Sequence, residues 1–197
     1  LETPAPVSLS CQSNWSAYCR SVIHYEAHIH PLWSKERVIL DGDGMEVDNY
    51  TCTGCHAGAD GDGAVQVPDA HLDLSDGASP DQPRQFEAYR QLLATRFEQD
   101  VVDGVLVDRQ VQDGFQRDDD GELILDDDGN PIPVFVRVPV PPVMSTAGAR
   151  ASTGFREAFS AGGTHEPFLS DAELRLVNEW LDLGAQYYNN PFDTPEN

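Results

Sequence analysis

The sequence predicts a mainly α-helical domain with one core, into which a β-hairpin region is inserted. Two stretches have the periodicity of amphipathic helices, residues 83–98 and residues 171–183, with large apolar side chains every three or four positions. Between them, residues 101–139 alternate valine-rich runs with Asp/Gly turns, as hairpins do. We therefore expect an extended lead-in at 1–20, a single domain at 21–197, and the hairpin insertion at 101–139.

The ends of the helices can also be read from the chain. Ser170 and Glu173 have the spacing of a capping box, and an apolar stripe follows them along residues 171–183. Two further helices are expected, at 26–37 and at 146–160. Helices thus precede and follow the expected hairpins.

Composition excludes several classes of protein. The chain has 197 residues, enough for one ordinary domain. It carries 12 Lys and Arg against 34 Asp and Glu, a net charge of −22, which excludes a nucleic-acid binder and disfavours an anionic membrane surface. No apolar run approaches the roughly 18–20 residues of a membrane span. Because the chain begins at Leu1, we expect a processed product or an excised piece, from which a leader could have been removed.

Acidic residues cluster with glycine in four places. Asp and Gly both tolerate turn geometry, so solvated turns are the simplest interpretation. Calcium binding in these oxygen-rich loops is the alternative, although none has the spacing of an EF-hand. The clusters are 41–44, 60–63, 118–122 and 126–130.

Two of the four cysteines belong to the run Cys52-Thr53-Gly54-Cys55-His56. C-x-x-C-H is the attachment signature of c-type haem, in which two thiols bond one porphyrin and the histidine binds its iron. A zinc ribbon would need a second pair of ligands at fixed spacing, and a thioredoxin-like motif would need a long helix after it. Neither companion is present, so the motif predicts one covalent haem c held by Cys52 and Cys55, with His56 as an axial ligand.

The other two cysteines, Cys11 and Cys19, are expected to form a short-loop disulfide. Disulfides persist in oxidising compartments, and c-type haem is attached outside the cytoplasm. Both inferences predict a periplasmic or secreted protein.

Three segments, taken together, resemble a known family. The run 25–33 before the haem motif, the motif 52–56, and the run 169–185 at the end are similar to class I monohaem cytochrome c modules. Such modules occur in secreted or periplasmic multi-module bacterial proteins. The resemblance implies a cytochrome c-like helical domain around one covalent haem, with the hairpin region as an insertion.

The second axial ligand of the iron is open to several side chains. Met144 follows a proline-rich segment that could hold a thioether over the haem, as in class I cytochromes, although a core methionine is the alternative. An open site is a further possibility. The other candidate ligands are Met45, His24, His28, His30, His71 and His165.

Arg150 and Arg156 follow Met144 on the expected helix 146–160. The guanidinium fork matches carboxylate geometry, so Arg150 is a candidate for binding a haem propionate. A surface salt bridge in this acidic protein is the alternative.

Three functions follow from these observations. The first is electron transfer by a haem iron cycling between Fe(III) and Fe(II), with no enzymatic turnover, in a module serving an extracytoplasmic redox enzyme. The alternatives are a haem enzyme or gas sensor with an open iron site, and an acidic calcium-dependent interaction module. The strong negative charge predicts a redox partner with a basic docking surface, and the module could be tethered to others.

Overall fold

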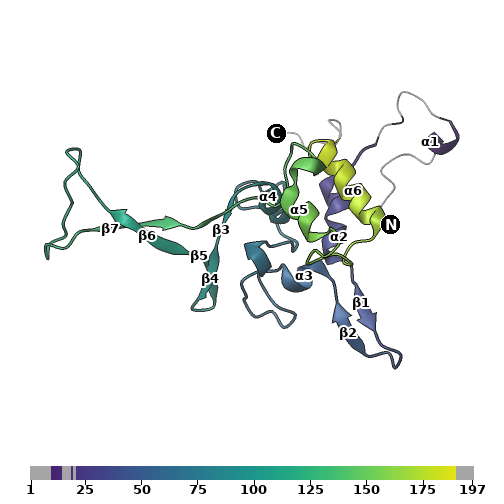
Figure 1. Cartoon of the computed structure of the whole chain (residues 1–197), viewed down its shortest axis with the longest axis horizontal. Helices are drawn as coiled ribbons and strands as arrows, with labels where there is room; N and C mark the ends of the chain where they lie inside the picture. The colour runs from purple at the N-terminus through teal and green to yellow at the C-terminus, as the bar shows by residue number, and fades with distance from the viewer. Residues whose placement is uncertain (1–9, 15–18, 20, 190–197) are drawn as a thin grey trace.

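The computed structural model describes residues 10–14, 19 and 21–189, and in it β-hairpins project from a helical body (Figure 1). Helical residues make up 27 % of this described part and strand residues 22 %. The prediction of a mainly α, cytochrome c-like helical domain is therefore wrong. The chain combines short helices with two-stranded sheets.

Most of the helical segments are only one or two turns long. The short helical turns are η1 (Tyr25–Ile29), η2 (Asp69–His71) and η3 (Ala149–Ala151), and the α-helices are α1 (Ser10–Ser13), α2 (Pro31–Ser34), α3 (Cys52–Cys55), α4 (Glu87–Leu93), α5 (Thr153–Ala158) and α6 (Asp171–Asp182).

The expected helices at 26–37 and 83–98 are shorter than predicted for identifiable reasons. Proline has no N–H to donate, so the first is divided at Pro31, which ends η1 and occupies the first turn of α2. The second ends at Leu93, because Arg96 and Phe97 leave the helical path to pair as strand β3.

Helix α6 is confirmed with its predicted cap. The Ser170 side chain accepts from the Glu173 backbone N–H, and the Glu173 carboxylate accepts from the Ser170 N–H at 2.8 Å. The apolar stripe buries Val177, Trp180 and Leu181 completely. This helix is therefore held by its packing as well as by its cap.

Aromatic side chains dominate the part of the core beneath α6. The Tyr25 ring is fully buried, stacks on Tyr187 with 5.6 Å between centroids, and meets Trp180 at 5.6 Å and Tyr89 at 5.1 Å. The backbone N–H of Tyr25 donates to the Tyr187 carbonyl at 3.0 Å. The early segment and the segment after α6 are joined in this cluster.

The strands form four antiparallel pairs. Residues 101–139 contain the predicted hairpins as paired strands, and a further hairpin, β1–β2, surrounds the acidic turn at 41–44. The pairs are β1 (Val38–Leu40) with β2 (Glu46–Asn49), β3 (Arg96–Phe97) with β8 (Pro139–Val140), β4 (Gln99–Val102) with β5 (Val105–Asp108), and β6 (Gln110–Phe115) with β7 (Pro133–Arg137).

The four acidic clusters fold into the same turn. At Asp60, the carboxylate Oδ1 accepts from the backbone N–H groups of Asp62 and Ala64, at 3.0 and 2.8 Å. The N–H of Gly63 donates to the Asp60 carbonyl, with Gly63 at φ +82°. The same bonds recur in the turns that begin at Asp41, Asp118 and Asp126. The interpretation of these clusters as turns is confirmed.

The predicted disulfide between Cys11 and Cys19 is present, with 5.6 Å between the two Cα atoms. Much of the predicted lead-in at 1–20 lies outside the described residues. Within the described ranges, no helix has the length and apolar character needed to span a bilayer.

Candidate functional site: an apolar pocket beside the C-x-x-C-H turn

The C-x-x-C-H segment and Met144 line one cavity of about 350 Å³. Its volume lies within the range of roughly 300–1,000 Å³ common to small-molecule sites. Apolar and aromatic side chains make up most of the wall, among them Trp33, Leu72, Leu92, Phe155, Phe159 and Phe168. The chain thus encloses a largely apolar space next to its sulfur and imidazole groups.

Helix α3 presents the two motif cysteines differently. The Cys52 side chain is buried, whereas Cys55 is exposed, and both are free thiols. Burial raises the pKa of the Cys52 thiol, an effect that the nearby Arg37 charge opposes. Cys52 is therefore less readily ionised than an ordinary cysteine.

The His56 ring is oriented by the backbone of η2. Its Nδ1 lies 2.9 Å from the carbonyl oxygen of Asp69, and a carbonyl can only accept, so Nδ1 carries the proton. In the neutral ring, Nε2 is then the nitrogen with the lone pair. Ala70 and His71, which follow Asp69, both have φ of +54°, a conformation that costs free energy for residues other than glycine.

Arg96 holds this strained turn in place. Its buried guanidinium donates to the carbonyls of Ala70 at 3.0 Å and His71 at 2.9 Å. It also donates to the Pro141 carbonyl at 3.0 Å. Arg96 therefore connects the turn that orients His56 to the proline-rich segment that leads to Met144. The sequence does not predict this role of Arg96, because an arginine within an expected helix gives no signal of burial.

Met144 also lines the pocket, and its side chain is only 2 % exposed. Its backbone N–H donates to the Leu92 carbonyl at 3.0 Å, and the Phe155 N–H donates to the Val143 carbonyl at 3.2 Å. These bonds fix the segment between α4 and α5. The predicted stiff, non-helical placement of Met144 agrees with this geometry.

His165 is the other candidate ligand that lines the pocket. Its ring centroid lies 5.9 Å from that of His56, and it contacts Phe159 and Phe168 at 5.4 and 4.9 Å. Burial, together with the neighbouring His56, lowers the pKa of His165. An uncharged imidazole therefore lies beside His56 at neutral pH.

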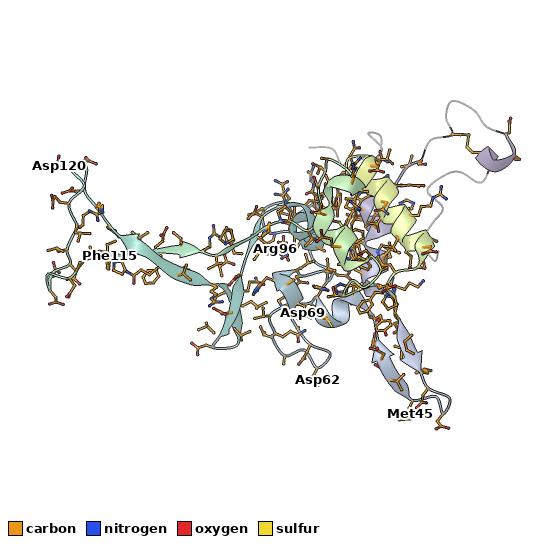
Figure 2. All side chains as sticks on the ribbon, in the orientation of Figure 1. Met45, Asp62, Asp69, Arg96, Phe115 and Asp120 are labelled. Atoms are coloured by element: carbon orange, nitrogen blue, oxygen red, sulfur yellow. A yellow bond between two sulfur atoms is a disulfide. The ribbon has the colours of Figure 1, made fainter. Side chains whose placement is uncertain are left out.

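The remaining sequence candidates lie away from the pocket lining. Met45 is 67 % exposed at the tip of the β1–β2 hairpin (Figure 2). His30 bonds Asp76 at 2.7 Å, and Nδ1 of His71 accepts from the Gln99 N–H at 3.0 Å. His24 and His28 contact each other, the backbone N–H of His24 lying 3.0 Å from Nδ1 of His28.

Arg150 is exposed on η3 and is not among the residues that line the pocket. Its carbonyl accepts a long hydrogen bond, 3.4 Å, from the Arg156 side chain.

The cofactor prediction, one covalent haem c with calcium as a further ion, is corrected by the structure. Among the residues that the structure describes, no group of three or more His, Cys, Asp or Glu side chains could hold a metal ion. Cys52 and Cys55 both line the cavity, but Cys52 is buried and Cys55 is exposed. In the acidic turns the first carboxylate already accepts two backbone N–H groups.

No family model matches the sequence, and neither a curated protein nor a solved structure matches it.

Proposed function

We propose that this chain transfers electrons outside the cytoplasm, and that the apolar pocket is its redox site. The observation that carries the proposal is that one cavity is lined by the thiols of Cys52 and Cys55, the imidazole of His56 and the buried thioether of Met144. Aromatic walls favour flat ligands, since ring faces and edges pack well against them. The Cys11–Cys19 disulfide supports an oxidising compartment.

Thiol–disulfide exchange by Cys52 and Cys55 is a weaker account of the same motif. Exchange requires an accessible thiol with a lowered pKa, because the thiolate is the nucleophile. The first cysteine of the motif is buried here, and burial raises its pKa. The geometry therefore favours a pocket that holds a separate redox group.

A redox enzyme that uses the same pocket is the second candidate. His165 favours it, because an uncharged imidazole next to His56 could take up or release a proton. Turnover of hydrogen peroxide with a reducing dye, lost in His165→Gln, would identify this activity.

The test is to export the full chain to a bacterial periplasm and record its visible spectrum and voltammogram. We expect a chromophore that changes reversibly with one electron. Met144→Leu should shift its midpoint potential, whereas Met45→Leu, at the exposed methionine, should not. A colourless protein without a reversible wave would refute electron transfer, and equal shifts in both variants would remove Met144 from the site.

A further inference from the structure

The arm formed by β6, β7 and the loops between them, residues 110–137, projects away from the helical body (Figure 1). Figure 2 places Asp120 at its far end and Phe115 along it. Strands β6 and β7 pair only with each other, so both outer edges of this ribbon are open. A two-stranded ribbon is at best marginally stable in water without further packing.

The arm exposes apolar side chains on both faces. Every residue of β6 is exposed, and Phe115 and Phe135 are 44 % and 56 % exposed. Because Val111 pairs with Val136 and Gln112 with Phe135, adjacent register positions place apolar groups on opposite faces. Leu123, Ile124 and Leu125 add exposed apolar area at the tip. Exposed apolar area of this extent is typical of an interaction surface.

The same arm is strongly negative. Residues 110–137 contain eight carboxylates and two arginines. Arg137 pairs with Asp108 at 3.0 Å and lies 3.8 Å above the Phe97 ring, and Arg117 donates to the Gly121 carbonyl. Both arginines are thus engaged, and no ion pair among the described residues involves the tip carboxylates.

We propose that the arm is a docking element for a protein partner whose surface is basic and carries an apolar groove or open strand edge. Charge selects this occupant: a second copy of the chain would bring a second acidic arm and repel the first, whereas a basic surface is attracted. The open edges supply backbone groups for strand addition, and the exposed Phe and Leu side chains supply apolar contact. This inference does not depend on the identity of the group in the pocket.

A labelled peptide of alternating lysine and valine, about ten residues long as strands are, serves as the probe, and fluorescence anisotropy measures its affinity for the full chain. The tip variant replaces six carboxylates by asparagine, which keeps the oxygen that accepts the turn hydrogen bonds: Asp118, Asp119, Asp120, Asp126, Asp127 and Asp128. A matched variant neutralises six carboxylates elsewhere and so has the same net charge: Asp41, Asp43, Glu46, Asp48, Asp60 and Asp62.

We expect the tip variant to weaken binding about tenfold or more, and the matched variant about threefold at most. Phe115→Ser with Phe135→Ser should also weaken it, although the charge is unchanged. If both charge variants lost the same affinity for the peptide, net charge alone would explain the binding, and the proposal would be overturned. Equal affinity for a lysine–serine peptide would overturn the apolar contact. Sedimentation that shows arm-dependent self-association would identify a second copy as the occupant instead.

Discussion

The carbonyl oxygen of Asp69 lies 2.9 Å from Nδ1 of His56, and this contact determines which ring nitrogen remains available. Residues 13 positions apart meet because η2 passes beside α3, and the turn after Asp69 adopts left-handed backbone angles at two consecutive residues. Such a conformation persists only where surrounding groups hold it. Arg96, through the carbonyls of Ala70 and His71, is the group that does so.

Arg96→Met should lower the free energy of unfolding by about 3 kcal/mol, because the carbonyls of Ala70, His71 and Pro141 lose the donor that the buried guanidinium supplies. Hydrogen exchange should rise in residues 69–72 more than elsewhere. Urea denaturation and exchange mass spectrometry measure the two effects. Arg150→Met is the control, since that side chain is exposed; it should change the stability by no more than about 0.5 kcal/mol. Equal effects of the two changes would contradict the role of Arg96.

Glu173 is the centre of a buried ion cluster that joins the start of α6 to the segment after α2. Its side chain is 4 % exposed, and its Oε1 lies 3.1 Å from Lys35 Nζ and 3.2 Å from Arg37 Nη2. Burial alone would raise the pKa of Glu173, but the hydrogen bonds from Ser170 and the charges of Lys35 and Arg37 outweigh it and lower the pKa. The carboxylate is therefore charged in the folded protein at neutral pH.

Glu173→Gln should destabilise the protein by about 3 kcal/mol, because the buried Arg37 loses its counter-charge. The Arg175–Glu179 pair on the same helix is exposed, with Arg175 at 81 %. Glu179→Gln should therefore cost less than about 1 kcal/mol. Thermal unfolding of the two variants at one pH measures the difference. Costs of similar size would show that burial of the Glu173 cluster contributes nothing.

The two motif thiols should react at different rates. Cys55 should be alkylated first, since its side chain is exposed. Cys52 should follow much later, because it is buried and burial raises its pKa. Iodoacetamide labelling followed by peptide mass spectrometry, with Cys52→Ser and Cys55→Ser as references, gives both rates. Faster labelling of Cys52 would place it in an accessible position and contradict the packing of α3.

Local signals in the sequence predicted local structure well. The hydrogen bonds of the capping box at Ser170 and Glu173 and of the Asp/Gly turns join residues that are close in the sequence, so local sequence is enough to predict them. The helix expected at 83–98 ends early because Arg96 bonds carbonyls of residues 70, 71 and 141, which are distant in sequence. Periodicity carries no information about such partners, and the helical fold class was predicted wrongly for this reason.

In the candidate site, too, the features carried by local sequence were predicted and those set by distant contacts were not. The motif at residues 52–56 and the loop-borne Met144 were found from the sequence, and both line the pocket. The placement of His165 beside His56, and of Arg150 outside the lining, depends on how the segments after Met144 pack. No spacing along the chain predicts that packing.

The repeated acidic turn requires glycine at one position and tolerates other residues at another. Gly63 has φ of +82°, whereas Gly61 has no positive φ and open space where a Cβ would be. Gly63→Ala should destabilise the turn by about 1 kcal/mol, since an L-residue is strained there. Gly61→Ala should be neutral or slightly stabilising, because alanine restricts the unfolded chain. Hydrogen exchange of the Gly63 and Ala64 amides against those of wild type distinguishes the two, and an equal response would exclude a left-handed turn.

Stability should fall as the pH is lowered through the range just below 6.5. Burial lowers the pKa of both His165 and His28 from the ordinary value of 6.5. In that range the unfolded chain has taken up a proton at each histidine and the folded chain has not, so the unfolded state binds more protons and the free energy of unfolding decreases. Urea denaturation at a series of pH values between about 7.5 and 5.5 brackets this histidine range.

Replacing both residues, His165→Gln with His28→Gln, should flatten this pH dependence, because the groups that take up protons on unfolding are gone. The loss due to Glu173 has the same sign, but it occurs at lower pH, below the ordinary value of 4.5, where the unfolded carboxylate is protonated first. The two ranges can therefore be separated in one titration. A double variant that keeps the full slope above pH 5.5 would show that neither histidine is held uncharged by the fold.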